Sequence, residues 1–141
     1  MKSLHVLPAL LLTLAAGTAV AAEPKTNLLD FSNDALIDDK TAMAIVAANT
    51  PAKVWKVYPA SKYALVSQVE GGLTAAKTCV VTARVMLLTV TSATKAALFR
   101  PQKMATAFDA AANSSTDACK AVAKDKLKEA TVAVVSALVK N

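Results

Sequence analysis

Histidine is almost absent from this sequence, which holds only His5 in 141 residues. Histidine is the side chain whose ordinary pKa lies closest to neutrality, so it dominates acid–base and metal chemistry. His5 lies in an N-terminal segment that we expect to be removed. The remaining chain therefore excludes Ser-His and Cys-His catalytic pairs and histidine-based metal sites.

Glycine is also scarce, with three residues in the whole chain. Only Gly71-Gly72 lies beyond the N-terminal segment, and two glycines do not make a phosphate-binding loop. The segment Ser92-Ala-Thr-Lys95 matches the Ser-x-x-Lys pattern of penicillin-binding enzymes. The Ser-Asp-Asn and Lys-Thr-Gly elements of that mechanism are missing, so we read the match as chance. The sequence predicts no cofactor and no metal.

A long apolar run occurs only at the N-terminus, where Lys2 precedes an apolar stretch and Ala-rich residues end it. This order is typical of a secretory signal peptide, which we assign to residues 1–22 with cleavage after Ala22 or one residue earlier. An uncleaved membrane anchor is the alternative. Residues 23–141 are then one periplasmic or secreted domain with no transmembrane segment. Loss of Lys2 lowers its formal net charge from +6 to +5.

Only two cysteines are present, Cys79 and Cys119. An exported chain meets an oxidising compartment, which favours a disulfide, and two cysteines allow a single pairing. Two buried thiols are the alternative. A disulfide would also exclude thiolate chemistry.

Acidic residues and helical spacing predict a first helix that ends at Asn49-Thr50-Pro51. Asp34, or Asp38 with Asp39, supplies its N-cap. Its buried face is predicted to hold four residues at helical spacing. These are Ile37, Thr41, Ile45 and Ala48. The preceding residues, 23–34, are expected to be an extended lead-in.

Three segments are predicted to be strands. Residues 63–69 alternate and end at a turn signal, Glu70-Gly71-Gly72. Residues 78–91 are rich in β-branched side chains, which favours a strand, with helix as the competing interpretation. Residues 98–108 form a third strand that Pro101 interrupts, which is typical of a sheet edge.

The last segment is predicted to be a long amphipathic helix that begins near Asn113–Asp117. Its apolar stripe consists of Cys119, Ala123, Leu127, Ala130, Val134 and Leu138. The element order predicts an α+β fold: an N-terminal helix, an antiparallel sheet of about three strands, and the long C-terminal helix packed on that sheet.

Two surfaces are candidates for binding. The first surrounds Trp55, where aromatic residues alternate with lysines, an arrangement suited to a protein partner. Core packing is its simpler explanation. We select Trp55, Lys56 and Tyr58 from this surface, Glu70 from the end of the strand 63–69 and Arg84 from the strand 78–91 as partner-binding residues.

The second surface is the stripe of Lys120, Lys124 and Lys128, with Lys126 beside it. It is suited to weak contact with anionic surfaces, or it is the solvated face of the helix. Nucleic acid is not expected as a partner, because arginine is limited to Arg84 and Arg100.

These observations predict a non-enzymatic binding protein that inhibits or neutralises a protein partner in the cell envelope or outside the cell. An immunity protein against a toxin, or an inhibitor of an envelope hydrolase, would fit. A small apolar-ligand carrier or an envelope-surface module is the second hypothesis. A small hydrolase that uses carboxylates, with Glu70 and Asp109 as the candidates, is the third.

Overall fold

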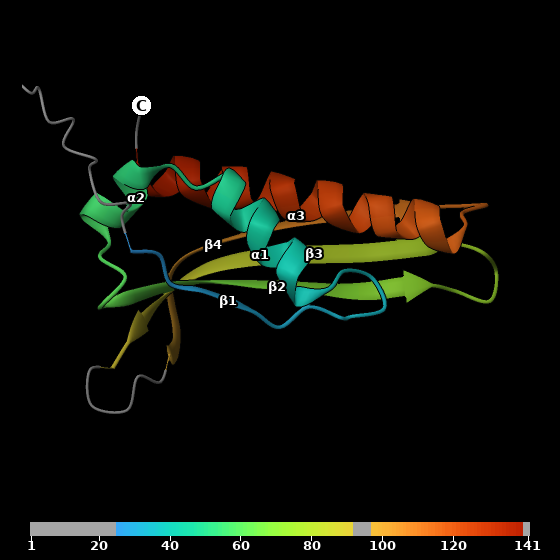
Figure 1. The fold of residues 1–141 in the computed structure, drawn as a ribbon. Helices are drawn as coiled ribbons and strands as arrows, with labels where there is room; N and C mark the ends of the chain where they lie inside the picture. The colour runs from blue at the N-terminus through green and yellow to red at the C-terminus, as the bar shows by residue number, and fades with distance from the viewer. Residues whose placement is uncertain (1–24, 92–96, 140–141) are drawn as a thin grey trace, which may run out of the picture.

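A computed structural model describes residues 25–91 and 97–139 (Figure 1). The predicted signal peptide, residues 1–22, lies outside these residues. The elements follow in the order β1 (Leu28–Asp30), α1 (Asp39–Ala48), α2 (Ala52–Val57), β2 (Tyr63–Leu73), β3 (Cys79–Val90), β4 (Ala97–Ala111) and α3 (Thr116–Leu138).

The four strands form one mixed sheet in the order β1-β2-β3-β4, with β1 parallel to β2 and the other pairs antiparallel. The predicted α+β class is confirmed, although the sheet has four strands and is not wholly antiparallel. The additional strand comes from the lead-in. The Ser67 hydroxyl donates to the Asp30 carboxylate, and the Val69 N–H donates to the Ser32 hydroxyl at 3.0 Å. These bonds hold the lead-in beside β2.

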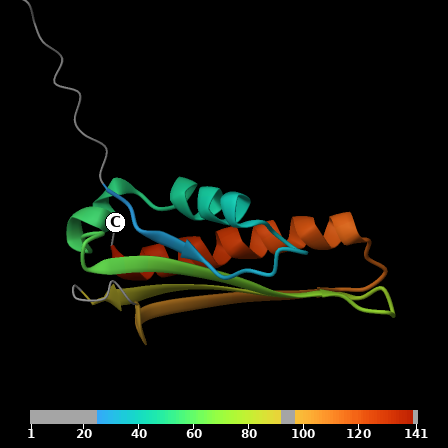
Figure 2. The ribbon, with the colours of Figure 1, turned by 60° about the horizontal axis from the view of Figure 1, so that its bottom comes forward.

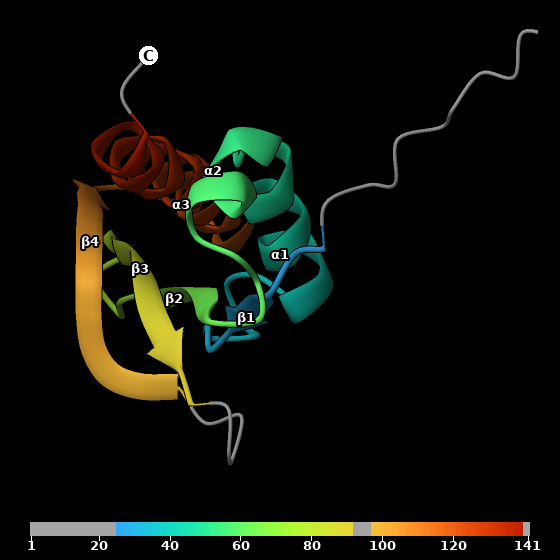
Figure 3. The same ribbon diagram turned by 90° about the vertical axis from the view of Figure 1, so that its left-hand side faces the viewer.

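The helices cover one face of the sheet, with α1 and α3 side by side (Figures 2 and 3). On β2, on β3 and on residues 103–111 of β4 the odd-numbered side chains point toward the helices, as buried Val69, Val81 and Ala107 show. All six residues of the predicted α3 stripe are buried. The α3 helix begins as predicted, since the Ser115 hydroxyl accepts the Ala118 N–H at 3.2 Å.

The Cys79–Cys119 disulfide is present, and both residues are buried. It joins the first residue of β3 to the first turn of α3. The central strand and the helix that covers it are thus covalently linked, as the sequence predicted.

The predicted turn at Glu70-Gly71-Gly72 is wrong, because β2 continues through it to Leu73. The chain reverses in the next residues, where the Thr74 N–H donates to the Thr78 carbonyl at 2.9 Å. Both glycines are part of the strand instead. Gly71 has a φ of 118°, and a Cβ placed on it would lie 2.0 Å from the Val80 carbonyl oxygen. Glycine lets β2 and β3 approach closely there.

The predicted buried face of the first helix is displaced. Ile37 is buried, but within α1 the buried residues are Ala42 and Val46, while Ala48 is exposed. The reason is that α1 packs against both α3 and the β1–β2 edge of the sheet. The short helix α2 was not predicted. It follows Pro51 and buries Val54 and Trp55.

Residues 79–90 form a strand, which decides between the two interpretations of this segment. The β4 strand is the sheet edge, and its pairing with β3 is irregular between Leu87 and Thr89, opposite Pro101. In Figure 3 β4 curves strongly at this end. On the face away from the helices a second apolar cluster forms near the curved end. It consists of Ala64, Val66, Met86 and Leu88.

Within the described ranges, 25–91 and 97–139, no helix combines the length and the apolar character needed to span a membrane.

Candidate functional site

The N-cap of α1 orients the first element of the candidate site. The backbone N–H of Thr41 donates to the Asp38 carboxylate at 2.9 Å, and its hydroxyl donates at 2.7 Å. These bonds hold the pKa of Asp38 below its ordinary value of 3.8, and the charge of Lys124 acts in the same direction. Of the caps considered from the sequence, Asp38 is the one used.

The depressed pKa of Asp38 predicts a specific pH dependence. The ionised cap stabilises the fold fully above the unfolded-state pKa, and this stabilisation is lost as the pH falls through the folded-state pKa. We expect D38N to show a weaker decline of melting temperature between pH 4 and pH 2 than the parent. Thermal unfolding across this range measures it. D34N, which alters an exposed carboxylate, is the control; equal pH profiles for D38N and the parent would contradict the prediction.

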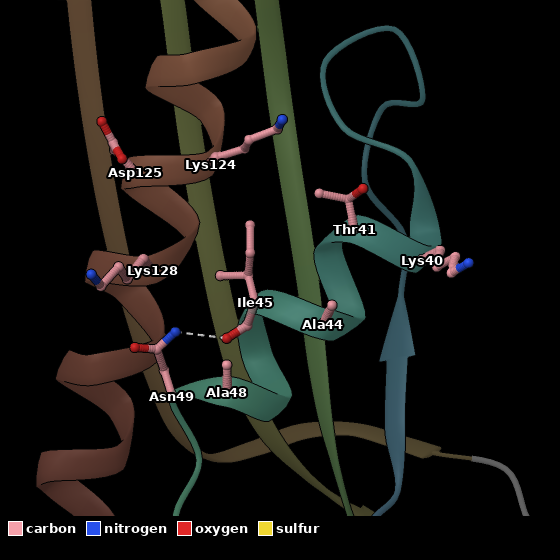
Figure 4. Close-up of a pocket in the computed structure, with 9 residues that line it drawn as sticks. All are labelled: Lys40, Thr41, Ala44, Ile45, Ala48, Asn49, Lys124, Asp125 and Lys128. Atoms are coloured by element: carbon pink, nitrogen blue, oxygen red, sulfur yellow. Dashed lines mark hydrogen bonds between the residues drawn. The ribbon is translucent and has the colours of Figure 1, made fainter.

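A groove of about 850 Å³ runs between α1 and α3 (Figure 4). The α1 side contributes Lys40, Thr41, Ala44, Ile45, Ala48 and the C-cap Asn49. The α3 side contributes Lys124, Asp125 and Lys128. In Figure 4 Lys124 extends from α3 toward α1, and Ile45 points back toward α3, whereas the amine of Lys40 points away from α3.

The floor of the groove is apolar and shallow because small residues lie next to its one large residue. Ile45 is half-buried, whereas Ala44 and Ala48 are exposed. At one end the Asn49 side-chain amide donates to the Ile45 carbonyl at 2.8 Å. This bond leaves the Asn49 side-chain oxygen as an acceptor. The groove thus offers an apolar strip about three side chains long.

The three cations that line the groove form no ion pair within 4.0 Å with a described residue, although Asp125 also lines the groove and the charge of Lys124 acts on Asp38. The ion pairs that join two residues within 25–91 and 97–139 are those of Lys126, which contacts Glu129 at 2.8 Å and Asp109 at 3.7 Å. The hydrogen bond that the Lys126 amine donates to Glu129 raises the pKa of Lys126, and Asp109 adds to the effect. Lys124 and Lys128 form no such pair. They lie one helical turn apart, with about 5–6 Å between their Cβ atoms.

The sequence-predicted binding residues divide between two other places. Trp55, Lys56 and Tyr58 lie at α2, where Trp55 is only 6% exposed. Trp55 lines a hollow of about 510 Å³ together with residues from the chain before β1. Tyr58 packs edge-on against Tyr63, with ring centroids 5.3 Å apart. Within this group Lys56 is therefore exposed, whereas Tyr58 and its neighbour Tyr63 are half-buried.

Glu70 and Arg84 come together on the sheet face away from the helices. With Gln68 and Thr82 they line a hollow of about 260 Å³. The Gln68 amide donates to the Glu70 carboxylate at 3.2 Å. The Nε of Arg84 is buried and has no hydrogen-bond partner among the residues that the structure describes. Glu70 and Arg84 are diagonal neighbours on this face, because the β2–β3 register places Gln68 opposite Arg84 and Glu70 opposite Thr82.

The two carboxylates considered for hydrolysis do not meet. Glu70 lies on the open face of the sheet beside Thr82, whereas Asp109 lies on the helix-covered face and contacts Lys126. The thickness of the sheet separates them. In the parts of the chain that the structure describes, no group of three or more His, Cys, Asp or Glu side chains is arranged to hold a metal ion.

Sequence reasoning identified half of the α1–α3 groove. The lysine stripe on α3 was recognised, but its position beside α1 was not. Ala44 and Lys40 gave no signal by themselves, because an alanine on an exposed helix face is unremarkable until a second helix lies beside it. The four-residue spacing of Ala44 and Ala48 was the available indication.

The fold defines the chain as an α+β protein with a helix-covered mixed sheet. No protein-family model and no curated protein sequence matches the chain. The solved structures that resemble it include a PelC dodecamer from Paraburkholderia phytofirmans, with a TM-score of 0.43 and 13% identity over 81% of this chain and 89% of that one. Another is a single-substitution variant of the same PelC, with a TM-score of 0.42, 13% identity and coverage of 81% of this chain and 91% of that one. Similarity at this level extends neither function nor assembly to this chain.

Proposed function

We propose that this chain is an exported, non-enzymatic binding protein that acts in the periplasm or outside the cell. Its partner is a protein with an acidic amphipathic helix, which lies in the α1–α3 groove. Binding inhibits or neutralises that partner, such as a toxin or an envelope hydrolase. The disulfide supports export, since such bonds persist in oxidising compartments.

The observation that carries the proposal is the combination of an apolar floor with two lysines that have no ion-pair partner within 4.0 Å in the described part of the chain. A helix in a groove is recognised through apolar anchors on one face and charges beside them. Carboxylates four residues apart on a helix have the same spacing as Lys124 and Lys128 on α3. An apolar residue between them would contact Ile45, and the small side chains of Ala44 and Ala48 would let it approach closely.

The alternative functions receive less support from this arrangement. A carrier of small apolar ligands needs a pocket that surrounds its ligand. The groove floor instead has two of its three apolar residues exposed. A hydrolase that uses Glu70 with Asp109 needs both carboxylates at one substrate, but they lie on opposite faces of the sheet.

The test uses a synthetic helical peptide with leucines on one face and glutamates four residues apart beside them. We expect it to bind the purified protein, to shift the amide signals of α1 and α3 in NMR spectra, and to bind more weakly as salt rises. Replacing both groove lysines, K124E with K128E, should weaken binding at least tenfold. A peptide with lysines in place of glutamates should not bind.

The matched control is K56E with K62E, which changes the net charge equally on exposed residues outside the groove. It should retain peptide binding. Loss of binding in this control, with full binding in K124E/K128E, would overturn the groove assignment in favour of the α2 surface. Binding to phosphatidylglycerol vesicles without binding to the acidic peptide would overturn the proposed protein partner.

A further inference from the structure

Along β4, the backbone N–H and C=O groups of alternate residues point toward a free edge of the sheet. The N–H of Thr74 donates to the Thr78 carbonyl, and the N–H of Val90 donates to the Lys62 carbonyl at 2.8 Å. Both bonds follow the β2–β3 register, so even-numbered residues of β3 bond with β2. Odd-numbered residues of β3 therefore bond with β4, through its odd-numbered residues.

The even-numbered residues of β4 consequently direct their N–H and C=O groups away from β3. These are Met104, Thr106, Phe108 and Ala110, and no strand of the described chain lies beyond them. The Ala110 N–H agrees with this assignment, since it donates to the Asp109 side chain at 2.8 Å. Met104 is 55% exposed and Phe108 is 72% exposed. Along Met104, Thr106 and Phe108 this edge combines backbone groups that have no described strand beside them with exposed apolar side chains, which suits it to pairing with another strand.

The residues on this edge are complementary to themselves in reverse order. The segment reads Lys103-Met-Ala-Thr-Ala-Phe-Asp109, with a cation at one end, an anion at the other and Thr106 at its centre. Lys103 is exposed, whereas one Asp109 carboxylate oxygen accepts the Ala110 N–H at 2.8 Å and the other lies 3.7 Å from the Lys126 amine. We infer that β4 pairs antiparallel with β4 of a second copy, about a two-fold axis at Thr106.

This register satisfies both the backbone and the side chains. It places Met104 opposite Phe108, and Thr106 opposite Thr106 of the second copy. The N–H and C=O groups of these residues face the edge, so each pair is a hydrogen-bonded pair. Lys103 falls opposite Asp109 at a non-hydrogen-bonded pair. There the Cα atoms lie about 4.5 Å apart and the side chains approach most closely. Each dimer thus has two ion pairs and two Met–Phe contacts.

Other arrangements of two copies lose these contacts. Parallel pairing in register would set Lys103 against Lys103 and Asp109 against Asp109. Displacement by one residue would place a residue whose N–H and C=O groups face the partner strand opposite a residue whose groups face its own β3. A displacement by two residues keeps the hydrogen bonds but separates Lys103 from Asp109. The segment's symmetry therefore selects both the direction and the register.

Charge exchange tests the inference. In K103D both end residues are acidic, and in D109K both are basic, so each variant alone sets like charges opposite each other. A mixture of K103D with D109K restores both ion pairs in a heterodimer. We expect the parent to double its molar mass with rising concentration in analytical ultracentrifugation, each variant to dimerise at least tenfold more weakly, and the mixture to recover the parent's behaviour.

A cysteine at the axis provides a second measurement, because the native cysteines are already paired. In T106C the new thiols would face each other with Cα atoms about 5.5 Å apart, which permits a disulfide. We expect T106C to form a covalent dimer under mild oxidation far faster than S61C, an exposed position away from β4.

Three results would overturn the inference. These are a parent that stays monomeric at high concentration, a mixture that dimerises no better than its components, and T106C cross-linking at the rate of S61C. The readouts are molar mass and cross-linking, whereas the proposed function is tested by peptide binding. Failure of one is therefore distinguishable from failure of the other.

Discussion

Replacing Cys79 and Cys119 together by alanine is expected to lower the free energy of unfolding by about 4 kcal/mol. The bond joins residues 40 positions apart, and in the loop-closure model the cross-link stabilises the fold by restricting the unfolded chain. It also holds the start of α3 against β3, where both cysteines are buried. Urea unfolding followed by circular dichroism measures the difference between the parent and the double variant.

The single variants C79A and C119A are the controls, because each already breaks the bond. They should lose nearly as much stability as the double variant, so the effects should not add. Unfolding the parent under reducing conditions should move its midpoint toward that of the variants. A loss below about 1 kcal/mol in the double variant would contradict a stabilising role for the disulfide.

Replacing Gly71 by alanine is expected to lower the free energy of unfolding by about 3 kcal/mol. A positive φ costs an L-residue about 1–3 kcal/mol. The new Cβ would also lie 2.0 Å from the Val80 carbonyl oxygen, which is backbone and cannot rotate away. The two central strands would have to separate locally. Urea unfolding measures the loss, and amide hydrogen exchange should rise first in β2 and β3.

Gly72→Ala is the matched control, since the neighbouring glycine also has a positive φ but a Cβ there would meet nothing within 4 Å. It should cost about 1 kcal/mol, from backbone strain alone. An equal loss in the two variants would show that strain, rather than the contact with Val80, makes Gly71 necessary.

The elements with a regular pattern were predicted well. Both the apolar stripe of α3 and its Ser115 cap are as expected, because helical spacing and capping depend on residues close in sequence. The predicted alternation in β3 matches burial from Cys79 to Val85, with Val81 and Val85 buried under the helices and Arg84 half-buried on the opposite face. The turn at the glycines was wrong because glycine marks either a reversal or a close backbone approach, and the pattern alone does not distinguish them.

The candidate site was predicted less completely. The binding residues chosen from the sequence lie at α2 and on the open sheet face, and only Glu70 and Arg84 share a hollow. Trp55 is packed in the core. An aromatic side chain can be buried even when lysines are its neighbours in sequence, because the long lysine side chains extend to solvent. The groove required knowing which flank of α3 lies beside α1, and that depends on how both helices pack on the sheet.

The sequence by itself determined the α+β class, the long C-terminal helix with its buried stripe, the single cysteine pairing and the edge position of β4. Each follows from local spacing, from residue type or, for the disulfide, from the presence of only two cysteines. Tertiary structure alone decided the parallel addition of β1, the close approach at Gly71 and the placement of the lysines beside Ile45. These features depend on contacts between residues that are distant in sequence, and a local sequence pattern does not indicate such contacts.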